Sequence, residues 1–226
     1  MLEKPPLGLF VVGTDTSVGK TYVTCRLAET LRREGRKVGV YKPAESGWED
    51  PDDPRSDAHR LWEAAGRVGT IDEVCPMRLK TPIAPHLAAA AEGRVWDRRL
   101  IRSGLSVWKG RCDIVLVEGA GGLLSPLGDD ESVIDLAAEF GYPLLLVGAD
   151  RVGVVNQVRL TIVAAKSLYP RLPIAGVILC RTTDERDPSR ESNAAVLQQR
   201  IDVPILATID YRQTDVAWSP KLRELL

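Results

Sequence analysis

The feature that most constrains this chain is a glycine-containing loop that joins a buried apolar run to a helix. The apolar run 7–12 is followed by G-T-D-T-S-V-G-K-T, residues 13–21, and then directly by a helical pattern. In such a loop the backbone N–H groups point inward and the helix N-terminus adds positive potential, so the turn favours a bound phosphate. Lys20 can reach the terminal phosphates of a nucleotide, and the Thr21 hydroxyl can coordinate Mg²⁺.

The loop departs from the strict P-loop pattern G-x-x-x-x-G-K-S/T at one position. That pattern requires a glycine where this chain has Thr14, and the glycine stands one residue earlier, at Gly13. The V-G-K-T core between an expected strand and an expected helix still favours a phosphate-binding loop. The alternative is a glycine turn with a solvated lysine.

The other apolar runs predict a parallel β-sheet. Most are short and nearly continuous in apolar residues, without alternation, which is typical of strands covered on both faces. Helical patterns lie between them, and strand–helix alternation with right-handed crossovers predicts a doubly wound α/β domain whose ligands bind beyond the carboxyl ends of the strands. The expected strands are 7–12, 37–41, 113–117, 143–147, 174–179 and 203–209, and the expected helices are 20–34, 56–65, 98–108, 132–139, 156–167 and 189–200.

Length and composition favour one domain with a real core. The chain has 226 residues, 44% of them hydrophobic and 27% charged, and we expect a single P-loop α/β domain over 1–226 with an insertion around 48–96. The net charge of −1 lacks the basic surplus typical of nucleic-acid binders. The chain shows neither a membrane-length apolar run nor a secretion signal, and its four cysteines form no C-x-x-C pair. These features predict a cytoplasmic protein that binds neither nucleic acid nor membrane.

A second candidate site element is the run D-I-V-L-V-E-G-A-G-G, residues 113–122. Glu118 stands where the acid of a Walker-B strand belongs, and a carboxylate there can hold Mg²⁺ directly or through water. The residues that follow, Gly119 to Gly122, have almost no side chains, so a substrate or phosphate could approach the backbone closely.

Further polar candidates follow the second strand. Lys42 leaves the sheet at its carboxyl edge, and we expect its ammonium beside the first loop, so that Lys20 and Lys42 come from two neighbouring strand ends. Ser46 lies in the same segment. The loop 50–57 carries four aspartates, and spacing does not settle which of them reaches a metal. Ser56 is a natural helix N-cap. The two histidines, His59 and His86, have no Cys or His partner at ligand spacing.

Taken together, the motifs resemble the dethiobiotin synthetase family. The resemblance rests on G-T-D-T-x-V-G-K-T, Y-K-P-x-x-S-G, S-D-A at 56–58, P-x-x-P-H at 82–86 and V-E-G-A-G-G, and it extends from about residue 7 to residue 209. It implies an ATP- and Mg²⁺-dependent enzyme of biotin biosynthesis that joins CO₂ to 7,8-diaminononanoate. A carbamate would attack the γ-phosphate of ATP, and the second amine would close on the mixed carbamic-phosphoric anhydride to give a cyclic urea, dethiobiotin.

The resemblance also implies roles for residues of this chain. Lys20 would hold the β- and γ-phosphates, and Lys42 would stabilise the carbamate and the transferring phosphoryl group. Thr16 and Ser46 would contact the diamine or its carbamate. The residues with an implied catalytic role are Lys42, Lys20 and Thr16. Thr21, Asp57 and Glu118 would surround Mg²⁺. The other implied nucleotide contacts are Ser17, Val18, Gly19, Tyr22, Gly119, Ala120 and Gly121.

The family is a homodimer in which the substrate carboxylate lies against a helix N-terminus of the partner subunit. In this chain that segment is R-V-G-V-V-N, 151–156, and the implied substrate contacts are Gly153, Val154, Val155 and Asn156. Backbone N–H groups at the positive end of the helix would be the donors.

One departure from the family concerns the nucleotide base. Many relatives have an asparagine after the strand 174–179, whereas this chain has Cys180 followed by Arg181, and Asp210-Tyr211 replaces a proline-containing segment. A thiol is a poor substitute for the donor and acceptor of an asparagine amide. We therefore expect these four residues to contact the nucleotide but to hold the base loosely.

Two other functions remain as alternatives. Cobyrinic acid a,c-diamide synthases use a similar nucleotide domain but add a glutaminase domain with a nucleophilic cysteine. Partition-type ATPases carry a lysine early in the loop, where this chain has Asp15, together with a basic surface or amphipathic tail that this sequence lacks.

Overall fold

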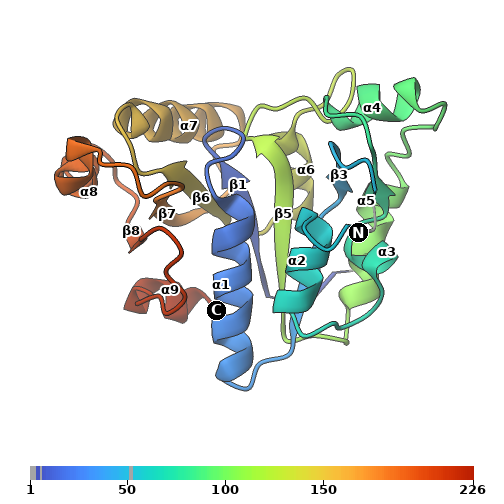
Figure 1. The fold of residues 1–226 in the computed structure, drawn as a ribbon, viewed down its shortest axis with the longest axis horizontal. Helices are drawn as coiled ribbons and strands as arrows, with labels where there is room; N and C mark the ends of the chain where they lie inside the picture. Colours follow the sequence, from blue (N-terminus) through green and yellow to red (C-terminus); the bar gives the residue numbers. More distant parts are fainter. Residues whose placement is uncertain (1–3, 6, 51–52) are drawn as a thin grey trace.

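The centre of the molecule is a six-stranded sheet in which every pair of neighbours is parallel. A computed structural model describes residues 4, 5, 7–50 and 53–226, and the strand order is β2-β5-β1-β6-β7-β8 (Figure 1). The predicted parallel α/β fold is therefore confirmed. The strands are β1 Gly8–Gly13, β2 Val38–Tyr41, β5 Ile114–Gly122, β6 Leu144–Ala149, β7 Ile174–Cys180 and β8 Ile205–Ile209.

The strands form because their residues are buried on both faces. Every residue of β1, β2 and β6 is buried, as the continuous apolar runs predicted. β1 lies between β5 and β6, so the loop that follows it opens at the middle of the sheet's carboxyl edge. In this fold class ligands bind beyond that edge.

Helices cover the sheet, and α1 (Lys20–Arg33) lies in front of it in Figure 1. Val23, Leu27 and Leu31 recur at spacings of four along this helix and form an apolar stripe that is buried. The helix ends before Gly35, whose φ of 86° closes the last turn. The other α-helices are α2 Asp57–Ala64, α3 Ile71–Val74, α4 Pro85–Ala91, α5 Leu100–Ser103, α6 Val133–Phe140, α7 Val154–Leu168, α8 Asn193–Gln198 and α9 Pro220–Leu225.

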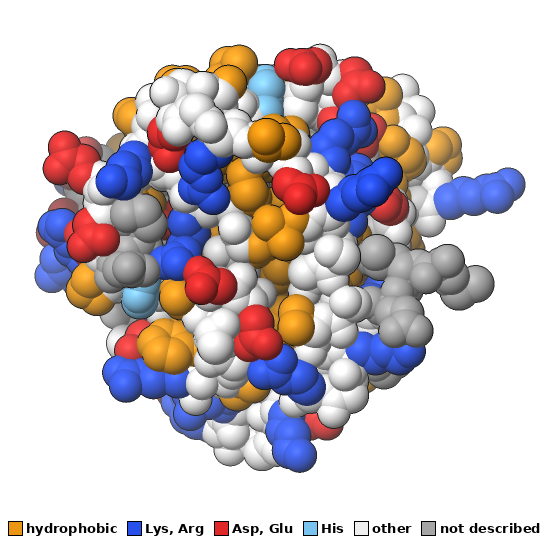
Figure 2. Space-filling model, turned by 90° about the vertical axis from the view of Figure 1, so that its right-hand side faces the viewer, with side chains coloured by type: hydrophobic (Ala, Val, Ile, Leu, Met, Phe, Trp, Pro, Cys, Tyr) orange, Lys and Arg blue, Asp and Glu red, His pale blue; other side chains and the backbone are white. Residues whose placement is uncertain are grey.

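The segment 48–96 forms a small layer beside β2. It contributes α2, α3 and α4, and its strand β4 (Met77–Arg78) pairs in parallel with β3 (Ala44–Glu45). Figure 2 shows the side of the molecule that carries α4, where acidic and basic side chains are interspersed around a strip of hydrophobic ones. None of the helices in the described ranges is both long and apolar enough to cross a membrane.

Two predicted helices are wrong in their extent. The segment 98–108 divides at Gly104 into α5 and a 3-10 turn, Gly104–Trp108. The segment 189–200 divides into a 3-10 turn, Pro188–Glu191, and α8, because Ser192 leaves helical geometry.

The strand β5 is longer than expected, and this changes the interpretation of its glycines. Gly119 to Gly122 continue the strand instead of forming a loop, with Gly13 paired to Gly122. A Cβ on Gly119 would lie 2.7 Å from Val133 Cγ1, and one on Gly121 would lie 2.5 Å from Ser125 Oγ. These glycines therefore admit neighbouring side chains of the same chain.

Candidate active site

The loop after β1 turns sharply and delivers the start of α1 to the carboxyl edge of the sheet. Ser17 and Gly19 adopt left-handed conformations, with φ of 55° and 95°. Gly19 is the N-cap of α1, and no side chain caps the helix. The N–H groups of the first helical turn thus lack a side-chain acceptor, which suits a bound anion.

Lys20 and Thr21 open α1 as predicted, and both are buried. Burial lowers the pKa of Lys20, and the charge of Lys42 acts in the same direction, whereas Glu118 and Asp57 oppose it. The positive charges of the two lysines therefore repel each other, and the negative charges of the two carboxylates offset this repulsion.

Glu118 is the anchor of the polar cluster and is fully buried within β5. Its Oε1 accepts hydrogen bonds from Thr21 Oγ1 at 2.8 Å and from Lys42 Nζ at 2.7 Å. Its Oε2 lies 2.9 Å from Thr24 Oγ1. Sequence reasoning missed Thr24; its position one helical turn after Lys20, on the buried face of α1, was the available signal.

Lys42 lies in this cluster, between two carboxylates. Its Nζ is 2.6 Å from Asp57 Oδ2 and 2.7 Å from Glu118 Oε1, and the residue is 3% exposed. Burial disfavours the charged form, but the two carboxylates outweigh it and raise the pKa of Lys42. Lys42 is thus a fixed cation.

One part of the Lys42 prediction is wrong. We expected the two lysines to come from neighbouring strand ends, but β2 pairs with β5 and not with β1. Glu118 on the intervening strand lies between them in the order of the sheet and contacts Lys42 directly.

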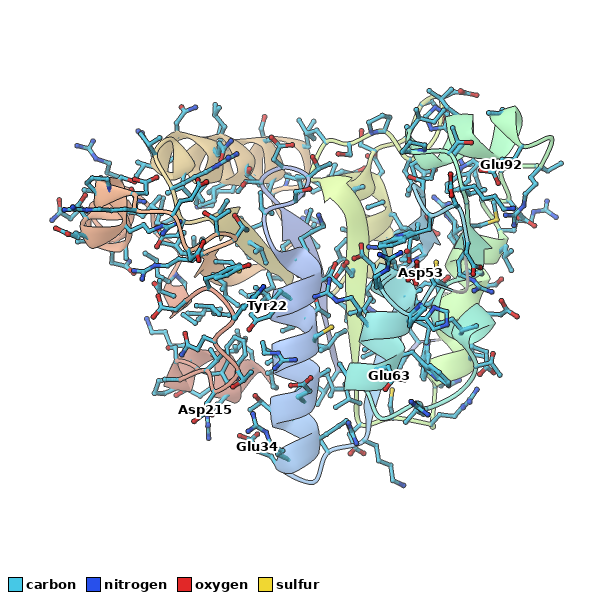
Figure 3. The ribbon with its side chains drawn as sticks, in the orientation of Figure 1. Tyr22, Glu34, Asp53, Glu63, Glu92 and Asp215 are labelled. Carbon is cyan, nitrogen blue, oxygen red and sulfur yellow. The ribbon has the colours of Figure 1, made fainter. Side chains whose placement is uncertain are left out.

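Among the aspartates of the 50–57 loop that the structure describes, Asp57 joins the cluster. It is the first residue of α2, and Ser56 caps that helix by accepting from the His59 N–H at 3.3 Å, as predicted. Burial would raise the pKa of Asp57, but the ammonium of Lys42 and hydrogen bonds from Lys42 and Thr21 lower it. Asp53 instead pairs with Arg55 on the surface, labelled in Figure 3. Asp52 lies outside the described residues, and Asp50 is exposed.

The donor set at this point fits Mg²⁺. Thr21, Asp57 and Glu118 supply a hydroxyl and two carboxylates, the hard oxygen ligands that Mg²⁺ prefers. The ammonium of Lys42 lies between the two carboxylates, so this point of the site already attracts positive charge. Over the described part of the chain, no group of three or more His, Cys, Asp or Glu side chains is placed to hold a metal ion.

A cavity of ≈ 380 Å³ opens in front of this cluster. Tyr22, labelled in Figure 3, stands at its wall on α1. Arg60, Thr182 and Arg212 also line it and were missed, because their chain positions carry no motif. The predicted residues that line it are Ser17, Gly19, Lys20, Thr21, Tyr22, Asp57, Cys180, Arg181 and Tyr211. The predicted contacts Val18, Glu118, Gly119, Ala120, Gly121 and Asp210 are not among its lining residues.

The far end of the cavity is formed by the ends of β7 and β8. Cys180 is buried, and burial raises the pKa of its thiol to about 12. A Cβ on Gly19 would lie 2.6 Å from Cys180 Sγ, so the thiol packs against the loop. Arg181 bridges Asp150 and Asp210, with its Nη1 2.5 Å from Asp210 Oδ1.

The predicted substrate residues are divided between two places. Thr16 is exposed, with its N–H bonded to Asp15 Oδ1 at 2.7 Å, and Ser46 Oγ donates to Ile83 O at 2.7 Å. Gly153 is the N-cap of α7, which follows β6, and two strands of the sheet, β5 and β1, separate β6 from β2, the strand that precedes Lys42.

The N-terminus of α7 is already partly satisfied. The Val154 N–H donates to Arg151 O at 3.1 Å, and the Val152 N–H donates to Asp187 Oδ2 at 2.8 Å. Val154 is therefore not a free donor. Val155 and Asn156 follow in the first turn of α7.

Comparisons with solved structures agree with this architecture. The chain is similar to the signal recognition particle receptor FtsY from Elizabethkingia anophelis in complex with GDP, with a TM-score of 0.58 and 17% identity, over 98% of this chain and 63% of that one. It therefore spans less than two thirds of that FtsY. It is also similar to the septum site-determining protein MinD complexed with Mg-ADP from Pyrococcus horikoshii, with a TM-score of 0.52 and 20% identity, over 97% and 84% of the two chains. At these identities the likeness concerns the fold alone.

Sequence comparisons are more specific. An AAA domain family model matches residues 7–217. The ATP-dependent dethiobiotin synthetase BioD of Rhodopirellula baltica is 45% identical over 213 residues, covering 88% of this chain and 82% of the relative. The enzyme of the same name from Anaeromyxobacter dehalogenans is 42% identical over 210 residues, covering 93% and 92%. On this identity and coverage, the chain belongs to the ATP-dependent dethiobiotin synthetase family.

Proposed function

We propose that this protein makes dethiobiotin from 7,8-diaminononanoate, CO₂ and ATP, with Mg²⁺. The observation that carries the proposal is the cluster in which Lys42 contacts both Asp57 and Glu118 beside the buried Lys20 and Thr21. Phosphoryl transfer depends on positioning and on neutralising charge, and two cations with an oxygen-rich metal site supply both.

In this proposal the chain's own groups hold the nucleotide. The uncapped turn at Gly19 and the ammonium of Lys20 bind the β- and γ-phosphates, and the cavity that continues past Tyr22 accepts the nucleoside. Thr21, Asp57 and Glu118 would hold Mg²⁺. The metal, when bound, neutralises charge on the phosphate oxygens.

Lys42 acts on the other reactant. One amine of the substrate adds to CO₂ and loses a proton to give a carbamate, and a carbamate oxygen then attacks the γ-phosphorus while ADP leaves. The second amine then attacks the carbonyl of the mixed anhydride, and phosphate and a proton leave as the cyclic urea forms. Lys42 carries a permanent charge beside the developing negative charge, which favours both steps. Thr16 and Ser46 would orient the diamine at the mouth of the loop.

The proposal includes a homodimer that completes the substrate site. Beside the loop after β1 lies a second hollow of ≈ 390 Å³, lined by Thr14, Asp15, Leu124 and Leu160 among others. Leu124 and Leu160 are exposed, and so is Val163 on the same helix as Leu160. An exposed apolar area next to the site supports a partner subunit there, which would bring its own α7 N-terminus to the substrate carboxylate.

The direct test is mass-spectrometric detection of the cyclic urea after incubation with diaminononanoate, bicarbonate and ATP. We expect the product only when all three are present with Mg²⁺. In parallel, the diamine plus bicarbonate should stimulate ATP hydrolysis, whereas DNA or liposomes should not. Stimulation by DNA or liposomes without product would instead indicate a partition-type ATPase.

A further inference from the structure

Glu45 is a buried carboxylate that none of the recognised roles uses. It stands in β3, three residues after Lys42, and is 4% exposed. Both of its oxygens bind backbone: Oε1 accepts from the Asp57 N–H at 3.0 Å and Oε2 from the Ala58 N–H at 2.8 Å. A single side chain thus accepts hydrogen bonds from the backbone of two consecutive residues, Asp57 and Ala58, and Asp57 is the candidate metal ligand.

These hydrogen bonds determine where α2 begins. The first N–H groups of a helix have no partner within the helix. Ser56 satisfies the N–H of His59, and Glu45 satisfies those of Asp57 and Ala58. A carboxylate at this end is also favoured by the helix dipole.

Glu45 is itself held in place by the small sheet. It pairs with Arg78 across β3 and β4, and its carbonyl accepts from the Leu79 N–H at 2.9 Å. The start of α2 is therefore tied to the same segment that carries Lys42. Both carboxylate oxygens of Glu45 accept hydrogen bonds from the backbone. Glu45 therefore adds negative charge near Lys42, while the ammonium of Lys42 makes its hydrogen bonds to Asp57 and Glu118.

We propose that Glu45 is a positioning residue that holds Asp57 in reach of the metal–phosphate site by clamping the N-terminus of α2 to β3. This inference rests on the proposed role of Asp57 as a metal ligand and adds a residue to it. The consequence is that Glu45 governs how strongly Mg²⁺ tightens nucleotide binding, although it touches neither metal nor nucleotide.

The test substitutes Glu45→Gln, which keeps the shape but places an amide donor against a backbone donor. We would measure the affinity for ADP by calorimetry in Mg²⁺ and in EDTA, and the binding of Mn²⁺ with ADP by electron paramagnetic resonance. The ratio of the two ADP affinities should fall by about tenfold, the usual effect of removing a group that supports a metal ligand. ADP affinity in EDTA should change by no more than about twofold, because the substitution does not alter the phosphate-binding loop between β1 and α1.

The matched control is Glu92→Gln. Glu92 Oε1 accepts from the N–H groups of Lys80 and Thr81 at 2.7 and 2.9 Å, so it makes the same kind of contact, and it lies at the end of α4 away from the site (Figure 3). This variant should leave the metal dependence unchanged. An equal loss in both variants, or no loss in Glu45→Gln, would overturn the proposal.

A double variant supplies an independent readout. In an Asp57→Asn background, Glu45→Gln should have no further effect on the metal dependence, because it acts through Asp57. Additive effects would show that Glu45 does not act through Asp57. Should Glu45→Gln fail to fold, Glu45→Asp, whose shorter carboxylate keeps the charge but not both hydrogen bonds, replaces it. All these readouts use ADP, so they are independent of whether the protein forms dethiobiotin.

Discussion

At the scale of single residues, Lys42 carries a buried positive charge that balances two carboxylates, the buried Glu118 and the half-buried Asp57. In Lys42→Gln, we expect ADP affinity to stay within a few-fold of wild type, whereas turnover should fall by ~100-fold or more, as when one charge-stabilising group is removed from an active site. Product formation and ADP calorimetry measure the two quantities. The exposed Lys80→Gln is the control, and unchanged turnover in Lys42→Gln would remove Lys42 from the mechanism.

A substitution of Glu118 tests the second proposed carboxylate ligand of the metal, which lies on β5. Both of its oxygens face donors, namely Thr21 and Lys42 at Oε1 and Thr24 at Oε2. Glu118→Gln removes the charge and points an amide N–H₂ at one of these donors. We expect the Mg²⁺ concentration for half-maximal activity to rise by about tenfold or more. A metal titration of activity measures this, with the surface variant Glu63→Gln (Figure 3) as control; an unshifted titration would exclude Glu118 as a ligand.

At the scale of elements, the ends of β7 and β8 form one end of the cavity that we propose for the nucleotide, and there they would contact the base. The Cys180 thiol packs against Gly19, and two charged side chains that follow these strands, Arg181 and Asp210, pair with each other. We therefore expect weak discrimination, with ATP preferred over GTP and CTP by less than about a hundredfold, since strong rejection requires dedicated hydrogen-bonding groups. Steady-state rates with the three nucleotides decide it, and a larger preference would contradict the prediction. Cys180→Ala should leave the ratios unchanged.

The elements that the sequence predicted are those whose burial is periodic or continuous. The strands of the large sheet and the helix α1 are of this kind. The loop between β1 and α1 is mostly exposed and was predicted instead from its V-G-K-T motif. The two-residue strands β3 and β4 were not predictable, because their pairing joins residues 33 positions apart and leaves no local pattern. The extension of β5 through Gly119–Gly122 was missed because glycine is a poor strand former, and here neighbouring side chains occupy the space above it.

At the scale of the whole molecule, strand order decides what the local motifs could not. The chain shows that Lys42 and Lys20 both follow strands, but nothing in it says that β5 lies between β1 and β2. That order places Glu118 in contact with Lys42 and lets Asp57 reach the same ammonium from α2. The hydrogen bonds between Glu45 and the start of α2 could not be predicted from the sequence either, because they depend on how the segment 48–96 packs beside β2.

The proposed dimer can be tested on the outer face of α7. Leu160 is 60% exposed and lines the hollow beside the loop after β1, next to Leu124, which is 52% exposed. Burial of these side chains against a second copy would favour association, and a charged residue there would oppose it. Leu160→Arg should therefore convert a dimer to a monomer in light scattering and abolish product formation, with ADP affinity retained because the nucleotide cavity is formed within one chain.

The control for the dimer prediction lies on the same helix. Leu168→Arg changes a similarly exposed leucine at the C-terminal end of α7, where it lines a separate hollow with Tyr169 and Pro170, and it should leave both mass and activity unchanged. A wild-type protein that is active as a monomer would refute the prediction, as would full activity in a monomeric Leu160→Arg. In either case the substrate carboxylate would have to be bound within one chain. Val155 and Asn156 would then lose their proposed role, because their helix follows β6, which β5 and β1 separate from β2 and Lys42 in the same subunit.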